Sequence, residues 1–214
     1  MSTLSEQGRQ GPGRREQQRV ETRREILSAA SALFAELGFE RTTTKLIAER
    51  AGVAQGTVFL VAPTKEALLV EVFDERLRAA AKERLASLPK KGIERQLGAF
   101  FDGMFALYAE KPALSRVLLK GILFFADPSS KAHYDAHVSA LSQVLEGLFQ
   151  AAEARGELAP KTDAKVAAAS VVALYLTSLV TVLNGDEPSE IALGKRFRAM
   201  LAQLFRGIGA KGPR

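Results

Sequence analysis

The sequence of 214 residues predicts an all-α protein. Apolar residues recur at three- and four-residue spacing in almost every segment, which is the period of a helix with one buried face. Alternating runs rich in β-branched residues, the pattern of strands between hairpin turns, are missing. Because 47% of the residues are hydrophobic, the chain can build a sizeable core as one large domain or two small ones.

The composition excludes several kinds of site. No cysteine is present, which excludes a disulfide framework, thiolate metal sites and a cysteine nucleophile. His133 and His137 have the i and i+4 spacing that can hold a metal, but Asp135 falls off that face and no further histidine exists, so we expect no metal. The net charge of +6 favours nucleic acid or another anionic partner.

Residues 1–21 are predicted to form a flexible basic arm. Glycine and proline interrupt its first part, arginines follow, and no apolar run provides a secretory signal, so we expect a cytoplasmic protein. The first helix is expected over residues 22–37, where apolar side chains fall on one face. Gly38 then ends it.

Two short helices follow, and they carry the functional signal. Thr43 is a suitable N-cap for the first of them, and Gly52 permits a tight turn before the second, over residues 55–61. Each is too short to be stable alone, so the pair predicts a helix-turn-helix within a DNA-binding domain over residues 22–70. An ordinary helical hairpin is the alternative interpretation.

The rest of the chain is predicted to form longer helices. Thr64 caps a helix over residues 65–87 that links the first domain to a second one over residues 71–214. Proline and glycine separate the helices of the second domain. We expect these helices over residues 93–109, 113–125, 129–155, 163–184 and 189–206.

One of these helices lacks charge over residues 166–183, close to the ~17–25 residues of a membrane span. Serines and threonines interrupt it and no second such segment exists, so we expect no membrane. A helix that is apolar on nearly every side also suits a core or a subunit interface. We predict a homodimer through the last two helices, whose second apolar face would combine Ile191, Leu193, Phe197, Met200, Leu201 and Leu204.

The run of residues 23–69 resembles the DNA-binding domain of the TetR (AcrR-like) transcriptional regulators. The matching segments are Arg24-Glu25-Ile26-Leu27, Leu33-Phe34-Ala35-Glu36, Gly38-Phe39, Thr42-Thr43, Ile47-Ala48-Glu49-Arg50-Ala51-Gly52-Val53, Gly56-Thr57-Val58-Phe59 and Lys65-Glu66-Ala67-Leu68-Leu69. The resemblance implies a homodimeric repressor that binds a palindromic operator on double-stranded DNA and leaves it when a small molecule enters the second domain.

Carried over onto this sequence, the resemblance implies three groups of DNA contacts. At the start of the first short helix, Thr43, Thr44 and Lys45 would contact the phosphate backbone. On the second short helix, the reading face would be Gln55, Gly56, Thr57, Phe59 and Leu60. Lys65, at the start of the long helix, would hold a phosphate.

The sequence also departs from the family pattern. Where members usually have a Tyr-x-Tyr/His-Phe pattern, this chain has Phe59-Leu60-Val61-Ala62, and Ala54 replaces the usual serine N-cap. Apolar groups thus stand where phenol or imidazole would bind phosphate. The alternative is a degenerate family member with weak or lost DNA binding, acting as a small-molecule-binding or membrane-peripheral interaction protein.

Aromatic stripes in the second domain predict a pocket for a hydrophobic effector, although such stripes also form plain cores. No Gly-rich phosphate loop, nucleophile elbow or carboxylate–histidine constellation is present, so we expect neither an enzyme nor a cofactor. The predicted lining is Phe101, Met104, Phe105, Tyr108, Phe124, Tyr134, His137, Tyr175 and Ser178.

Overall fold

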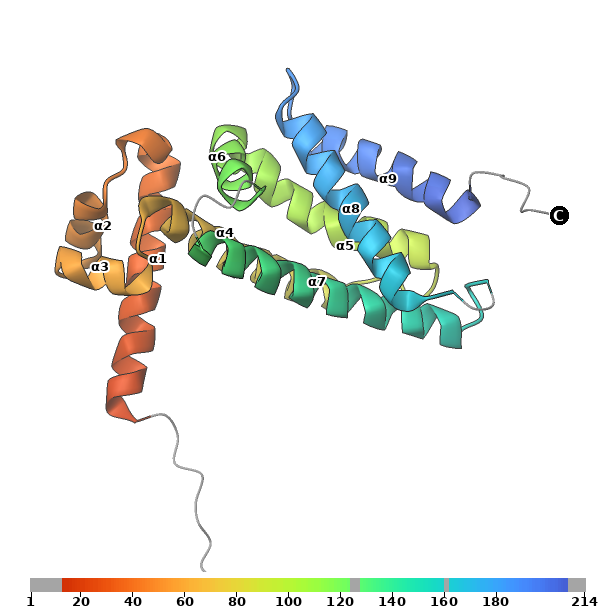
Figure 1. Ribbon diagram of the computed structural model, residues 1–214, viewed down its shortest axis with the longest axis horizontal. Coiled ribbons are helices and arrows are strands. Elements are labelled where there is room, and N and C mark those ends of the chain that lie inside the picture. Colours follow the sequence, from red (N-terminus) through yellow and green to blue (C-terminus); the bar gives the residue numbers. More distant parts are fainter. Residues whose placement is uncertain (1–12, 124–127, 160–161, 208–214) are drawn as a thin grey trace, which may run out of the picture. The chain divides into compact units, whose positions relative to one another are not determined.

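The computed structural model describes residues 13–123, 128–159 and 162–207, and these residues form helices and no strand (Figure 1). The prediction of an all-α protein is confirmed. The helices are α1 (Arg14–Arg41), α2 (Thr44–Ala51), α3 (Gln55–Val61), α4 (Lys65–Ala86), α5 (Ile93–Glu110), α6 (Pro112–Leu123), α7 (Pro128–Ala154), α8 (Ala164–Leu183) and α9 (Glu190–Arg206).

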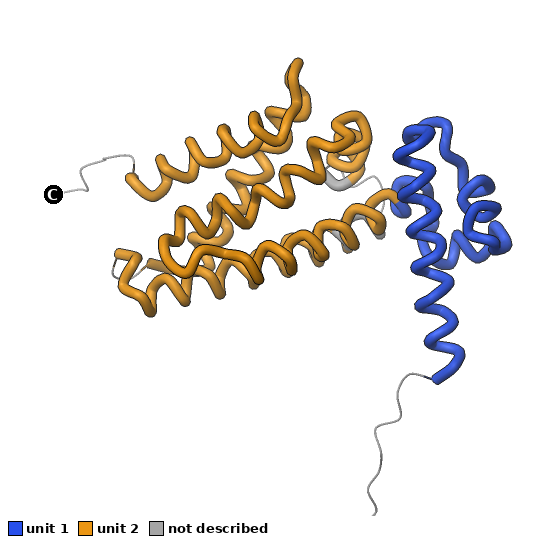
Figure 2. The backbone as a smooth tube through the Cα atoms, turned by 180° about the vertical axis from the view of Figure 1, so that it is seen from behind, with its two compact units in different colours: residues 1–68 blue, residues 69–214 orange. Residues whose placement is uncertain are grey.

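The chain divides into two compact units, residues 1–68 and 69–214 (Figure 2). The division falls inside α4, close to the predicted boundary after residue 70. The N-terminal unit holds the two short helices α2 and α3, and the C-terminal unit holds the longer helices.

Helix α1 begins at Arg14 rather than at Thr22, so the part of the predicted arm over residues 14–21 is helical, while residues 1–12 lie outside the described residues. This stretch is rich in arginine, glutamine and glutamate, which are good helix formers, and Glu16 pairs with Arg19 one turn on. The first buried side chain of α1 is that of Ile26. The helical stretch before it therefore forms without a hydrophobic face.

The N-terminal unit is built around Ile26, Ala30 and Phe34 of α1, Ile47 of α2 and Val58 of α3, all nearly or completely buried.

Close to its end, α1 bends at Gly38, whose φ of 77° lies in the left-handed region that favours glycine. The buried Thr42 hydroxyl donates to the carbonyl oxygen of Gly38 at 2.8 Å and to that of Leu33 at 3.1 Å. Thr42 thus ties the residue that follows the bend to the helix before it.

The core of the C-terminal unit is aromatic. Phe101 of α5 lies 4.8 Å from Tyr175 of α8 and 4.7 Å from Phe197 of α9, measured between ring centroids. Phe105, one turn further along α5, contacts the same two rings. These side chains are buried and fix α8 and α9 against α5.

The last two helices only partly match the predicted subunit interface. Leu193, Phe197 and Leu201 are buried inside the protomer, so they are not available to a partner. Ile191 and Leu204 are exposed, by 82% and 43%. In the described part of the chain, α8 alone is long and apolar enough to cross a membrane by length and composition, a test that the core helix of a soluble protein also passes.

Candidate nucleic-acid interface and ligand groove

The α2–α3 pair has the geometry that its sequence predicts. Thr43 caps α2 by accepting the backbone N–H of Leu46 at 3.2 Å. At the other end of α2, Gly52 has a left-handed φ of 67°, and the N–H of Val53 returns to the carbonyl of Ala48 at 3.0 Å. No side chain caps α3, because Ala54 has no acceptor to offer.

The outward face of α3 is uncharged and open. Gln55, Gly56, Phe59 and Leu60 are exposed, Leu60 by 86% and Phe59 by 47%, while Thr57 is half-buried. A Cβ on Gly56 would meet no atom within 4 Å, so its backbone is accessible to a large ligand. Amide, hydroxyl and apolar groups on one exposed helix face are suited to base edges in a major groove.

Gln55 joins the starts of the two short helices. Its side-chain amide donates to the hydroxyl of Thr44 at 3.0 Å, so the first residue of α3 is tied to the first residue of α2. Lys45 is exposed, with its ammonium 4.0 Å from Glu49 on the next turn. The predicted contact residues of α2 and α3 are therefore close together on one side of the unit.

Lys65, which is predicted to bind a DNA phosphate, also has a contact within the protein. Its ammonium donates to the backbone carbonyl of Phe39 at 2.8 Å and lies 4.1 Å from the centre of the Phe39 ring. That ring stacks on Phe34 in the core of the unit. Since an ammonium has three donors, the contact fixes the side chain and leaves donors for a phosphate.

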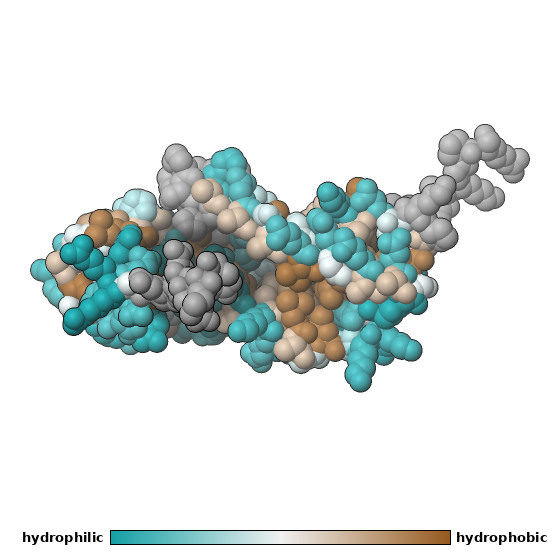
Figure 3. Space-filling view, turned by 90° about the horizontal axis from the view of Figure 1, so that it is seen from below, coloured by the Kyte–Doolittle hydropathy of each residue, from teal (hydrophilic) through white to brown (hydrophobic). Residues whose placement is uncertain are grey.

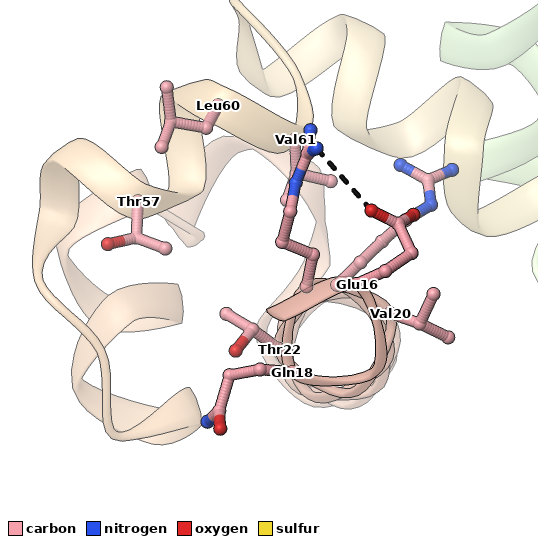
Figure 4. A pocket seen from close by; sticks show the side chains of 9 residues that line it. Glu16, Gln18, Val20, Thr22, Thr57, Leu60 and Val61 are labelled. Atoms are coloured by element: carbon pink, nitrogen blue, oxygen red, sulfur yellow. Dashed lines mark ion pairs between the residues drawn. The ribbon is translucent and has the colours of Figure 1, made fainter. Parts of the chain in front are cut away.

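A groove of about 490 Å³ separates the first part of α1 from α3 (Figure 4). Leu60 and Val61 of α3 line one side and Val20 of α1 lines the other, with the Glu16–Arg19 ion pair at 3.6 Å on the α1 side. This groove was not predicted, because residues 14–21 were expected to form a flexible arm rather than a helix.

A second groove, of about 400 Å³, lies in the C-terminal unit between α4, α5 and α7. Figure 3 shows an apolar surface bordered by hydrophilic side chains on this unit, in the region where α4 and α7 run in Figure 1. Most side chains of the groove are apolar; the charged ones are on α4, and α7 contributes a histidine. Its lining is Asp74, Leu77, Arg78, Ala81, Lys82, Leu85, Phe100, Met104, Ala136, His137, Ala140, Leu141 and Val144.

Asp74 and His137 form the polar part of this groove. Asp74 is only 8% exposed, its Oδ1 atom lies 3.6 Å from His137 Nδ1, and it also pairs with Arg78. Burial opposes ionisation of Asp74, but its contact with His137 and the positive charge of Arg78 outweigh burial, so the pKa of the carboxyl lies below its usual value. The groove thus holds a buried carboxylate.

A much smaller cavity, of about 30 Å³, shares Asp74, Leu77 and His137 with the groove. Tyr108 and Tyr134 are among its other lining residues. Tyr108 accepts a hydrogen bond from the hydroxyl of Tyr175 at 3.1 Å, and burial raises the pKa of Tyr108 to about 12.

A family model described as bacterial regulatory proteins of the tetR family matches residues 26–72. The transcriptional repressor KstR of Mycolicibacterium smegmatis is 30% identical over 165 residues, which cover 77% of this chain and 78% of the repressor. The chain belongs to the TetR family. KstR of Rhodococcus jostii is 27% identical over 196 residues, covering 90% of this chain and 86% of the relative.

Solved structures of TetR-family members share the fold. FadR of Thermus thermophilus in complex with lauroyl-CoA has a TM-score of 0.72 at 23% identity, covering 89% of this chain and 97% of that one. FadR of Bacillus subtilis in complex with stearoyl-CoA has a TM-score of 0.65 at 21% identity, covering 86% and 98%. As a TetR-family member, the chain is a DNA-binding and ligand-binding transcription regulator, and this family consists of regulators rather than enzymes.

About half of the residues that were predicted to contact the effector line one of the two cavities of the C-terminal unit. Met104 and His137 line the large groove, and Tyr108, Tyr134 and His137 line the small cavity.

The other predicted residues are placed elsewhere. Phe101, Phe105 and Tyr175 are core residues that line neither of these two cavities, because their rings pack on one another and on Phe197. Ser178 is buried and donates to the carbonyl of Leu174 at 2.8 Å. Phe124 lies outside the described residues.

The α4 side of the groove was missed altogether. Leu77, Ala81 and Leu85 line it at helical spacing, although this helix was predicted only to link the two domains. Among the described residues no group of three or more His, Cys, Asp or Glu side chains could hold a metal, and the His133 side chain lies outside them.

Proposed function

We propose that this TetR-family regulator is a homodimeric repressor, acting in the cytoplasm, that binds a palindromic operator and is released by a small hydrophobic effector. The observation that carries the proposal is the exposed, uncharged face of α3, held on a helix-turn-helix whose core is complete within the N-terminal unit. A face that is not needed for folding is available to read DNA.

In the proposed complex, α3 enters the major groove. Gln55 supplies an amide that can bond an adenine edge, and Leu60 supplies a methyl-rich contact for thymine. Lys45 and Lys65 are proposed to bind phosphates, with the Lys65 side chain fixed by Phe39. Arg14, Arg15 and Arg19 lie in the part of α1 that precedes its first buried residue, and we propose that they add contacts to the DNA backbone.

The proposed dimer face uses the exposed side of α8. Val166, Ala169, Ala173, Thr177 and Val180 are exposed and follow one another at three- and four-residue spacing, without a charge. Small residues in such a row allow two helices to pack closely. Ile191 and Leu204 of α9 would extend the buried area, and two protomers would form a four-helix interface.

The C-terminal groove is proposed to hold the effector. Its walls are mainly leucine, alanine, valine, methionine and phenylalanine side chains, which suits an apolar molecule. The FadR structures that share the fold contain lauroyl-CoA and stearoyl-CoA, both with long apolar chains.

Selection of bound fragments from random duplexes, followed by gel shifts at rising salt, tests the proposal. We expect one enriched sequence with two-fold symmetry, affinity that falls steeply with salt, and a complex containing two protomers. The double variant Gln55→Ala/Leu60→Ala should lose the enrichment, whereas Gln143→Ala on the exposed side of α7 should keep it. If no fragment is enriched at low salt, the alternative of a regulator that has lost DNA binding is correct.

A further inference from the structure

His137 carries a buried nitrogen that nothing in the described structure satisfies. Its Nε2 atom has no hydrogen-bond partner and is closed off from solvent, although the imidazole lines both the large groove and the small cavity. Such a buried, unpartnered nitrogen destabilises the folded chain, and a ligand that supplied a partner would relieve this cost.

Asp74 determines what kind of partner this nitrogen can take. The carboxylate lies on the Nδ1 side of the ring and favours a proton there, which leaves Nε2 as an acceptor in the neutral imidazole. If the ring is doubly protonated, Nε2 becomes a donor instead. A hydroxyl group both donates and accepts, so it satisfies Nε2 in either state.

Charge and size exclude an acidic head group at the same point. Arg78 pairs with Asp74 but its side chain is largely exposed, so water screens its charge, whereas the Asp74 carboxylate is almost buried and would repel a second carboxylate placed beside it. The small cavity next to the pair measures about 30 Å³, room for one water-sized group but not for a charged head with its hydration shell. Apart from Asp74, His137 and the two tyrosines, Tyr108 and Tyr134, its lining is apolar, which suits one small neutral polar group.

We propose that the effector is an apolar molecule with a hydroxyl group at one end, and that this hydroxyl binds His137 Nε2 beside the small cavity. The apolar body then lies along the groove past Leu77, Ala81 and Leu85. Asp74 is a positioning residue, since it acts through the imidazole. The inference rests on the proposed function only in taking this groove as the effector site.

Two isomeric probes test the inference by direct binding to the full-length chain. 1-Decanol donates and accepts a hydrogen bond, whereas its isomer 1-methoxynonane only accepts, and both displace Nile red from an apolar groove. Because the ether is less hydrated in water, a plain apolar groove would bind it more tightly. If the groove contains the proposed hydroxyl site, the order of the two affinities is reversed. We then expect 1-decanol to bind about tenfold more tightly than the ether.

Variants assign this preference to the named residues. In His137→Phe the ether should bind more tightly than the alcohol, as in a plain apolar groove. Gln143→Ala, at an exposed position on the same helix, should keep the wild-type preference for the alcohol. Asp74→Asn should lower the preference for the alcohol and raise the affinity for decanoate, because it removes the like charge. A purely structural role for Asp74 would not increase decanoate binding.

The possible results of these binding measurements either support or overturn the proposed hydroxyl site. A wild-type chain that binds the ether or decanoate more tightly than the alcohol overturns the inference, and so does a folded His137→Phe that keeps the preference. If His137→Phe does not fold, the wild-type order and Asp74→Asn decide. Displacement of Nile red without an alcohol preference leaves the proposed function intact, whereas no binding of Nile red or of any probe removes the effector groove itself.

Discussion

The carboxylate of Glu157 accepts the backbone N–H of Ile93 at 2.9 Å, so a residue that follows α7 caps the start of α5. It also accepts the N–H of Gly92 and is held by Arg155 at 2.8 Å. No side chain near the start of α5 in sequence provides this cap. The ends of two helices far apart in the sequence are thereby joined.

The Glu157 cap predicts acid sensitivity. Its hydrogen bonds with Arg155, Gly92 and Ile93 lower the pKa of Glu157 from 4.5 to about 2. Because the folded-state pKa is the lower one, the stabilisation is complete above pH ~4.5 and is lost as the pH falls toward 2. Thermal unfolding should show Glu157→Gln with a Tm a few degrees below wild type at pH 7, and the difference should shrink toward pH 2. A gap that stays constant with pH would contradict this.

Gln55 is predicted to read a base. Gln55→Ala should relax discrimination at one position of each half-site, at a cost of about 1–3 kcal/mol on the preferred operator, measured by fluorescence anisotropy on a set of single-base variants. Thr44→Val is the comparison variant: it removes the partner that Gln55 binds inside the protein together with a predicted phosphate contact, and loss of a phosphate contact weakens all sequences alike without relaxing base choice. If Thr44→Val lowers base discrimination at the same operator position by an equal amount, the Gln55 amide acts by holding α2 and α3 together and does not read a base.

Restoring a phenol on α3 should tighten DNA binding. Phe59 is 47% exposed at the position where the family pattern has tyrosine, so Phe59→Tyr adds a hydroxyl that can reach a phosphate. We expect about tenfold higher affinity for specific and non-specific duplexes alike, with an unchanged Tm. Leu60→Tyr places a phenol one residue away as a control and should not give this uniform gain. An equal gain for both variants would show that a phenol at either position suffices, and would contradict a specific phosphate contact at position 59.

A charge on α8 should separate the protomers. Ala173 is exposed in the middle of the uncharged row, and Ala173→Glu would place a carboxylate on its counterpart across a two-fold axis. Light scattering should give the mass of a monomer, near 23.1 kDa, and operator affinity should fall by more than tenfold. Gln143→Glu on the exposed side of α7 should change neither. A dimer that survives Ala173→Glu would place the interface on another surface.

The helix-turn-helix could be predicted because its signals are local. Thr43 caps α2 from the adjacent position, and Gly52 ends it in a conformation that favours glycine, so neither depends on distant parts of the chain. The helical start of α1 could not be predicted from periodicity. Its side chains are exposed before Ile26, and a helix without a buried face has no apolar repeat to detect.

The groove was harder to predict because apolar periodicity does not separate a core from a cavity wall. Phe101 and Met104 lie one turn apart on α5, yet the first packs among aromatic rings and the second lines the groove. The difference arises from the neighbouring helices, which fill the space beside Phe101 and leave it open beside Met104. Likewise, the meeting of Asp74 and His137 depends on how α4 and α7 pack.

The lack of buried side chains in the first part of α1 affects which substitutions this regulator can tolerate. Residues 14–25 bury no side chain, yet they form one wall of the groove that faces Leu60 on α3. Substitutions there cost the fold little, since surface changes away from packed groups usually alter stability by about 0.5 kcal/mol or less. Natural variation or protein engineering can therefore change the chemistry of this wall while the folded domain behind it stays the same.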